Sequence, residues 1–306
     1  MFNRKQKHIL LKFFSMFSVV RGYNILIVVI AQYLASIYIF ASDMPLKKVL
    51  FDVNLLMLVL ATAAVIAAGY IINNFYDSEK DLINRPNKTM LDKLVSQNTK
   101  LSFYFVLNFS AVVMASYVSF KPVLFFSFYI FAIWFYSHKL KKRPIIGNVV
   151  SALLTLTPFF VIFVYYYNFK YVILVHATFL FLIISIRELT KDLENIKGDL
   201  TQNYRTVPIV YGEATSKQII TALVVATLFP VYFLIAKFDI GYMYLYFFIC
   251  EILLIIYLIL LWSFSTKTQY LWLHNILKLI IVAGVFSILL IDVDLVINRI
   301  MSVNFI

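Results

Sequence analysis

An acidic cluster directly follows the second long apolar run of the chain. The stretch "NNFYDSEKDLINRPNK", residues 73–88, places Asp77, Glu79 and Asp81 within five residues. If the apolar run continues as a helix, Asn73, Asp77 and Asp81 are spaced i, i+4 and i+8 and lie on one face. Like charges four residues apart repel, and an Asp at the bilayer centre would cost about 2.5–3.5 kcal/mol. We therefore expect a cation to neutralise this face.

A second polar stretch, "RELTKDLENIKGDLTQNYRTVPIVYG" at residues 187–212, also follows a long apolar run. It carries oxygen-bearing side chains at the helical spacing i, i+4, i+7 and i+11: Glu188, Asp192, Asn195 and Asp199. Four apolar runs separate the two stretches, so both are expected on the same side of a membrane, facing one cavity. Mg²⁺ prefers oxygen ligands and is usually held by a few carboxylates together with substrate phosphates. The pattern predicts two Mg²⁺ ions with a diphosphate between them.

Basic residues accompany both acidic stretches: Arg85, Lys88, Lys141, Arg143 and Arg205. Such side chains would bind the outer oxygens of a diphosphate. A purely acidic site would repel a diphosphate, and a purely basic one would not need a metal. The alternative interpretation is a pair of solvated loops with ordinary mixed charge, which leaves the shared helical register unexplained.

The composition identifies the elements that must position these residues. The chain has 306 residues and is 62% hydrophobic but only 14% charged, whereas soluble domains are about a quarter charged. It is therefore expected to be an all-α, polytopic membrane protein and a single domain over 1–306, with 1–18 as a cytoplasmic, interfacial segment. Segments of about 20 apolar residues span a bilayer. Nine are predicted, near 22–40, 51–74, 101–119, 122–138, 146–166, 171–188, 217–236, 240–263 and 272–297.

The distribution of Lys and Arg predicts the orientation. With the N-terminus inside, 20 basic residues fall on the inner side and 6 on the outer side. Inner loops carry the excess of Lys and Arg in membrane proteins, so we expect a cytoplasmic N-terminus and an external C-terminus in the cell membrane. The net charge of +12 is thereby explained without a nucleic-acid partner.

Both acidic stretches match known signatures. Residues 73–81 resemble N-D-x-x-D-x-x-x-D with Asn74 in place of the first Asp, and "INRP" at 83–86 resembles its usual sequel. The second stretch resembles K-D-x-x-D-x-x-G-D through Lys191, Asp192, Gly198 and Asp199, with Asn195 where Asp is common and Glu194 beside it.

Two further segments, residues 19–24 and 136–149, complete a resemblance to the UbiA superfamily of intramembrane prenyltransferases. The resemblance implies nine transmembrane helices around a central cavity, with both acidic motifs on the cytoplasmic side. It implies Mg²⁺-dependent transfer of a prenyl group from a prenyl diphosphate to a lipophilic acceptor.

The resulting hypothesis assigns residues to roles. The metal ligands would be Asn73, Asp77, Asp81, Asp192, Glu194, Asn195 and Asp199, and the four Asp residues among them would carry catalysis. Substrate contacts would come from the basic residues above and from Arg21, Asn24, Tyr136, Ser137 and Lys191.

The acceptor stays open at this point. The second motif looks most like the branch that forms an ether with geranylgeranylglyceryl phosphate, and the basic run 139–143 would suit a second phosphate or would only enforce topology. An aromatic prenyltransferase of quinone biosynthesis, acting on 4-hydroxybenzoate or a similar acceptor, is the alternative. An ion-coupled transporter is a third reading, but it predicts charges within several spans. Prenyl chain length, oligomeric state and the roles of Glu251 and Lys278 are not predicted.

Overall fold

The computed structural model describes residues 4–301, and this part of the chain contains helices but no strand. Nine of its helices are long and apolar enough to cross a membrane, as predicted. The long helices are α2 (Gly22–Ala35, extended by η1, Ser36–Phe40), α4 (Val53–Asn84), α6 (Gln97–Val118), α7 (Phe120–His138), α8 (Ile146–Tyr166), α9 (Tyr171–Thr201), α10 (Val207–Lys237), α11 (Tyr244–Ser263) and α12 (Lys267–Ser287). The short ones are α1 (Arg4–Val19), α3 (Leu46–Leu50), α5 (Pro86–Asp92), η2 (Leu140–Lys142), η3 (Gly241–Met243), η4 (Ile288–Leu290) and α13 (Val293–Met301).

Several predicted boundaries were wrong because hydropathy detects the apolar part of a helix and not its end. The second span was predicted to end at residue 74 and the sixth at 188, but α4 continues to Asn84 and α9 to Thr201. Both extensions carry the acidic motifs, so the helical register assumed for them is confirmed. The seventh span was predicted to begin at 217, but helix begins at Val207 and is interrupted at Gly212, where φ is 86°.

The ninth span also differs from the prediction of 272–297. A capping box of Thr266 and Gln269 begins α12 at Lys267. The Asp292 side chain then accepts a hydrogen bond of 2.8 Å from the Leu295 amide, which caps a separate helix, α13. α6 and α7 are separated by the extended Ser119, and Pro122 sits in the first turn of α7, where proline is tolerated.

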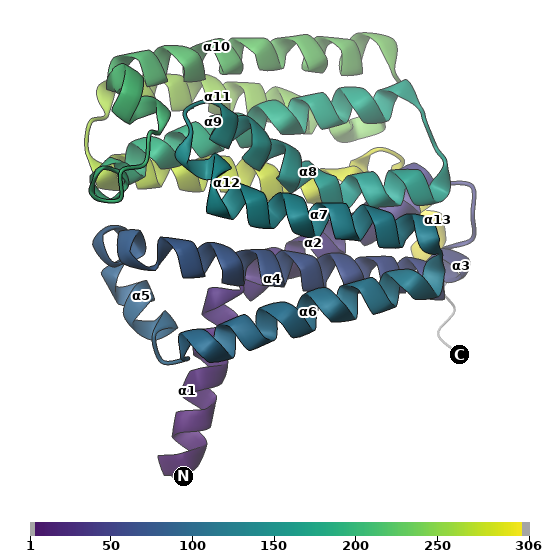
Figure 1. Cartoon of the computed structure of the whole chain (residues 1–306). Coiled ribbons are helices and arrows are strands. Elements are labelled where there is room, and N and C mark those ends of the chain that lie inside the picture. Colours follow the sequence, from purple (N-terminus) through teal and green to yellow (C-terminus); the bar gives the residue numbers. More distant parts are fainter. Residues whose placement is uncertain (1–3, 302–306) are drawn as a thin grey trace. The chain divides into compact units, whose positions relative to one another are not determined.

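The helices group into two compact units. The first contains residues up to Val29, Val53–Val150 and Lys197–Arg205. Within it, α4 packs against α6 and α7, as Figure 1 shows. Small residues allow this close approach: Ala111 and Ala115 of α6 are fully buried, and a Cβ on Gly69 of α4 would lie 3.0 Å from Ile133.

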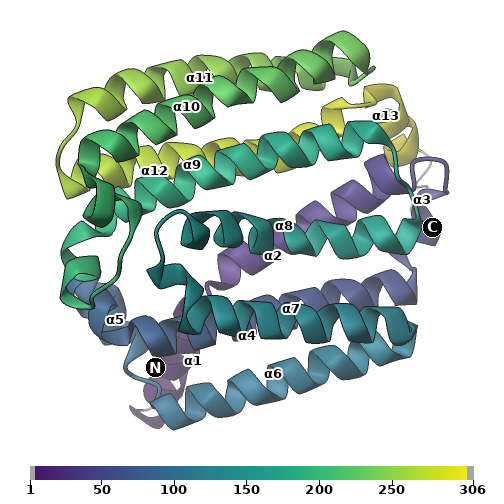
Figure 2. The ribbon, with the colours of Figure 1, turned by 45° about the horizontal axis from the view of Figure 1, so that its top comes forward.

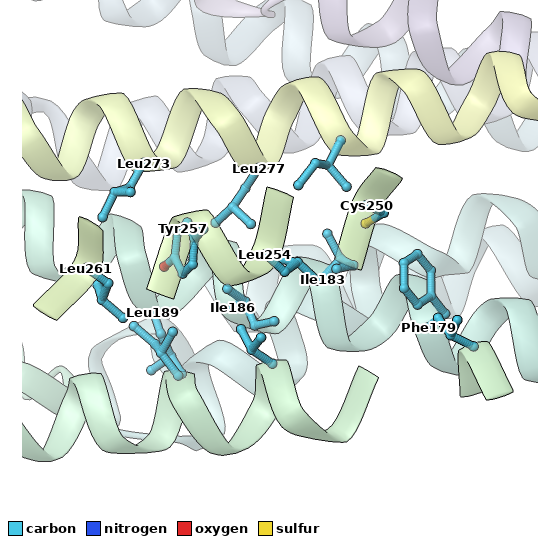
Figure 3. Packing of buried hydrophobic residues seen from close by; sticks show 14 of the residues in the cluster. Phe179, Ile183, Ile186, Leu189, Cys250, Leu254, Tyr257, Leu261, Leu273 and Leu277 are labelled. Atoms are coloured by element: carbon cyan, nitrogen blue, oxygen red, sulfur yellow. The ribbon is translucent and has the colours of Figure 1, made fainter. Parts of the chain in front are cut away.

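The second unit contains Ile30–Asp52, Ser151–Ile196 and the chain from Thr206 onward. In it α11 packs against α10 and α12, which can be followed in Figure 2. Figure 3 shows apolar side chains from three helices meeting in its core: Phe179, Ile183, Ile186 and Leu189 of α9, Cys250, Leu254, Tyr257 and Leu261 of α11, and Leu273 and Leu277 of α12.

A buried arginine ties the end of the second unit to its first segment. The guanidinium of Arg299, on α13, donates hydrogen bonds to the carbonyl oxygens of Ile37, Ser42 and Met44, at 2.6–2.8 Å. It also lies 5.6 Å from the centroid of the Tyr38 ring, within the distance of about 6 Å at which a ring face attracts a cation. The guanidinium thereby satisfies one carbonyl oxygen of η1 and two of the segment that follows it.

Candidate functional site

The acidic face of α4 holds a lysine from a distant part of the chain. Lys141 Nζ lies 2.8 Å from Asp77 Oδ1 and 3.1 Å from Asn73 Oδ1. Asp77 and Lys141 are both buried. One carboxylate oxygen and one amide oxygen, a helical turn apart, therefore converge on a single positive charge, as the sequence analysis expected of this face.

A tyrosine completes the surroundings of Asp77. The Tyr204 hydroxyl donates a 2.8 Å hydrogen bond to Asp77 Oδ1. A tight turn brings it there: Asn203 adopts a left-handed φ of 53°, a conformation that Asn tolerates, and the Tyr204 amide bonds back to the Asp199 carbonyl at 2.9 Å. Burial and the Asp77 carboxylate raise the pKa of Tyr204 above its ordinary value, so its hydroxyl stays protonated as a donor.

The same turn brings the end of the second motif to α4. Lys80 Nζ lies 2.6 Å from Asp199 Oδ1, and the Asp199 side chain is fully buried. Gly198 permits this approach, because a Cβ there would lie 2.3 Å from the Asn84 amide nitrogen. Four of the predicted ligands belong to the same unit of the structure: Asn73, Asp77, Asp81 and Asp199.

Asn74, which stands where the family signature has Asp, belongs to a buried hydrogen-bond network. Its Nδ2 donates to Asp92 Oδ2 at 3.3 Å, and its Oδ1 accepts from Lys100 Nζ at 3.0 Å. Asp92 also accepts from Ser18 at 2.8 Å and from Lys88 at 3.1 Å. Lys88, expected to bind substrate, is engaged here with a carboxylate.

Two predicted substrate contacts at the start of α2 meet on one aromatic ring. The Arg21 guanidinium lies 5.0 Å from the centroid of the Tyr70 ring, and Asn24 Nδ2 donates to the Tyr70 hydroxyl at 3.1 Å. Arg21 has a left-handed φ of 50°. A non-glycine residue in that region is unfavourable and is typical of functional positions.

The remaining basic candidates of the first unit are more open. Arg143 and Arg205 are exposed, and Arg85 is half-buried. The Arg205 amide donates to the Lys142 carbonyl at 3.0 Å, which joins the segment after α9 to the segment after α7. Tyr136 is half-buried and Ser137 is buried at the end of α7.

The part of the second motif that lies in the second unit forms its own ion pairs. Glu188 accepts from Arg187 at 2.7 Å and from Lys191 at 3.0 Å. Glu194 Oε2 lies 2.8 Å from His274 Nδ1, with both side chains buried.

Asn195 is buried and Asp192 is half-buried on α9. Their proposed roles as ligands, and that of Glu194, stay predictions.

Residues 4–301 contain no group of three or more His, Cys, Asp or Glu side chains close enough to hold a metal ion. Amide oxygens are also ligands for Mg²⁺, and the shared ammonium contact of Asn73 and Asp77 demonstrates that their oxygens can meet on one cation. The donor chemistry therefore fits a hard divalent cation.

Sequence reasoning missed four members of this site: Lys80, Asp92, Lys100 and Tyr204. The two lysines had been counted only as topological charges. Their carboxylate and amide partners are distant in sequence, and one sequence contains no signal that pairs them.

Known proteins resemble this chain over most of its length. The profile of the UbiA prenyltransferase family matches residues 16–286. A digeranylgeranylglyceryl phosphate synthase of Methanobrevibacter smithii is 26% identical over 237 residues, which are 74% of this chain and 80% of that protein. The synthase of the same name from Thermococcus sibiricus is 36% identical over 169 residues, which are 53% of this chain and 60% of the relative.

Solved structures show the same fold. A structure from a study of digeranylgeranylglyceryl phosphate synthase in membranes has a TM-score of 0.68 at 22% identity, covering 90% of this chain and 97% of that one. A UbiA homolog from Archaeoglobus fulgidus, bound to GPP and Mg²⁺, has a TM-score of 0.61 at 14% identity, covering 90% and 99%. The match of the family profile over most of the chain shows that this protein belongs to the UbiA prenyltransferase family.

Proposed function

We propose that the enzyme transfers a geranylgeranyl group from its diphosphate to geranylgeranylglyceryl phosphate and forms an ether lipid precursor. The main structural support for this proposal is the convergence of Asn73, Asp77 and Lys141 in a buried, charge-balanced cluster. The relatives named above, both digeranylgeranylglyceryl phosphate synthases, support the choice of acceptor.

The reaction breaks the allylic C–O bond of the prenyl diphosphate and forms a C–O bond to the acceptor hydroxyl, with release of a proton and diphosphate. Mg²⁺ ions, two in this proposal, would supply the charge that stabilises the leaving diphosphate. Asn73, Asp77 and Asp81 would hold them from α4, and Asp192 and Asp199, assisted by Glu194 or Asn195, from α9.

The basic side chains have a separate task. Lys141, Lys142 and Arg143 follow α7 within three residues of one another, and Arg205 is joined to this segment through the Lys142 carbonyl. In the proposed reaction they bind phosphate oxygens, either of the donor or of the acceptor. A neutral quinone precursor would leave part of this positive charge unused.

The apolar, aromatic-rich helices exclude water from the reacting carbon. A carbocation-like allylic group reacts with any water present, so exclusion protects the product. We further propose that the motif-bearing ends of α4 and α9 face the cytoplasm and that the C-terminus is external, because the distribution of basic residues favours this orientation.

The deciding experiment supplies purified enzyme with labelled geranylgeranyl diphosphate and a panel of acceptors. We expect an ether product with geranylgeranylglyceryl phosphate. Prenylation of 4-hydroxybenzoate or another aromatic acid, with none of the glyceryl phosphate lipid, would overturn the acceptor.

Variants test the metal site in the same assay. Asp77→Ala and Asp192→Ala should abolish transfer while the protein still inserts in the membrane. Glu79→Ala is the matched control, because Glu79 is exposed, lies on the same helix and falls off the face shared by Asn73, Asp77 and Asp81. Near-normal turnover in either Asp variant would refute the proposed metal site.

A further inference from the structure

Tyr204 lies where three lysines and one key carboxylate meet. Its side chain is almost completely buried. Its hydroxyl contacts Asp77, while Nζ of Lys80, Lys142 and Lys141 lie 4.5, 5.2 and 5.9 Å from its ring centroid. All of these residues belong to the first unit. Neither motif includes this tyrosine, and the proposed mechanism does not use it.

The hydroxyl fixes one side of the Asp77 carboxylate. Tyr204 and Lys141 both donate to Oδ1, each at 2.8 Å. Within residues 4–301, these two hydrogen bonds leave Oδ2 as the carboxylate oxygen available to a cation. A carboxylate held by two donors on one oxygen has a fixed orientation, and such outer partners of metal ligands contribute strongly to metal affinity.

The ring has a different effect on the lysines. Three ammonium groups in one region repel one another, and each lies within about 6 Å of the ring centroid, where the ring's negative face attracts cations. Two of the three also pair with carboxylates, Lys80 with Asp199 and Lys141 with Asp77. The Lys142 side chain is exposed, and it contacts this cluster through the Tyr204 ring.

We propose that Tyr204 is a positioning residue, whose hydroxyl orients Asp77 toward the metal and whose ring holds Lys80, Lys141 and Lys142 beside the diphosphate. This inference rests on the proposed metal site. It separates two contributions of one side chain: the hydroxyl acts on metal affinity and the ring acts on the prenyl diphosphate.

Two substitutions separate these contributions. Tyr204→Phe removes only the hydroxyl, and Tyr204→Leu removes the hydroxyl and the ring. The matched control is Tyr257→Phe, because Tyr257 is also fully buried and its hydroxyl lies 2.6 Å from Thr190 Oγ1 in the second unit. This control reports what the loss of any buried tyrosine hydroxyl does to the fold.

The first measurement is binding of Mn²⁺ to purified protein, followed by electron paramagnetic resonance. Tyr204→Phe should weaken Mn²⁺ binding by about tenfold or more, in the range found for outer partners of metal ligands, and Tyr257→Phe should leave it unchanged. The second is the KM for prenyl diphosphate at saturating metal, which should rise further in Tyr204→Leu than in Tyr204→Phe. The Mg²⁺ concentration that gives half-maximal activity, measured in native membranes, tests metal affinity again without extracting the protein into detergent.

Asp77→Asn distinguishes failure of this inference from failure of the proposed function. If Asp77→Asn abolishes Mn²⁺ binding but Tyr204→Phe binds as the unchanged protein does, Tyr204 does not position Asp77 and the inference is overturned. If Asp77→Asn itself binds Mn²⁺ normally, the proposed metal site is wrong. Equal KM values for the Phe and Leu variants would overturn the role assigned to the ring.

Discussion

The network of Asn74, Asp92 and Lys100 predicts that an amide and a carboxylate can be exchanged between two positions. Asn74 and Asp92 are both buried, and the amide of Asn74 is needed on both sides: it donates to Asp92 and accepts from Lys100. Asn74→Asp removes the donor and adds a charge. Asp92→Asn removes the charge that compensates the lysines. The double variant, Asn74→Asp with Asp92→Asn, again has one amide and one carboxylate in this network.

Distances indicate which term decides the cost of Asn74→Asp. At an effective dielectric constant of 20, two carboxylates at the 3.3 Å of the present hydrogen bond repel by about 5 kcal/mol. The attraction between the new carboxylate and Lys100, at 3.0 Å, is about 5.5 kcal/mol. These terms nearly cancel, so the lost hydrogen bond to a charged group, about 1.5–3 kcal/mol, decides the sign: the variant is destabilised.

The second single substitution, Asp92→Asn, is destabilising for another reason. Asp92→Asn leaves the partly exposed Lys88 without its carboxylate, and it removes the carboxylate in contact with the Asn74 amide that binds the buried Lys100. Loss of a charge from such a buried network should cost about 3 kcal/mol. The double variant should recover about 2–3 kcal/mol relative to the sum of the single variants.

Thermal unfolding of the four proteins in detergent measures this coupling. Each kcal/mol should change the melting temperature by about 2 °C in a chain of this size, so each single variant should melt several degrees lower and the double variant close to the unchanged protein. Additive losses in the double variant would refute the reasoning, because they would mean that Asn74 and Asp92 do not act as a pair.

Three further outcomes are expected. Removal of divalent cations by a chelator should abolish prenyl transfer, and Mg²⁺ or Mn²⁺ should restore it, since the proposed ligands are all oxygen; full activity in excess chelator would contradict the metal site. In a Cys250→Ser background, Ser78→Cys should resist an impermeant thiol reagent added to intact cells, and its labelling there would reverse the proposed topology. Arg299→Ala should lower thermal stability by about 3 kcal/mol, through hydrogen bonds lost from a charged donor, with Arg299→Lys intermediate; an unchanged melting temperature would show that this clamp does not stabilise the fold.

The sequence was sufficient for the class of fold and for the register of the motifs. Spans are readable because a bilayer demands long apolar runs. The register is readable because a helix repeats every 3.6 residues: Asp77 and Asp81 indeed lie on one helix, as do Asp192 and Asp199. Helix ends were less predictable, since α4 and α9 continue well past their apolar runs by the same backbone hydrogen bonds.

Partners across the fold were not predictable. Asp77 is 64 residues from Lys141 and 127 from Tyr204, and the second partner depends on a left-handed Asn203 that reverses the chain after α9. Nothing in local spacing distinguishes this lysine from the others of the basic run. The choice between Asp and Asn at position 74 was visible as a departure from the motif, but its reason, the carboxylate of Asp92, is apparent only from the packing of α5 against α4.

The ion pairs explain how a membrane protein can keep acidic residues buried at the ends of its spans and, for Asp92, on the short helix α5 that follows one of them. An isolated buried carboxylate is strongly unfavourable, and here each of three has a lysine within 3.1 Å: Asp77 with Lys141, Asp92 with Lys88, and Asp199 with Lys80. Such a cluster is close to electrically neutral. It follows that a divalent cation and an anionic diphosphate would enter it most favourably together, because either alone would leave a net charge in a poorly solvated region. Binding of Mn²⁺ should accordingly be tighter in the presence of a non-reactive prenyl diphosphate than in its absence, and equal affinities in the two conditions would contradict this account of the site.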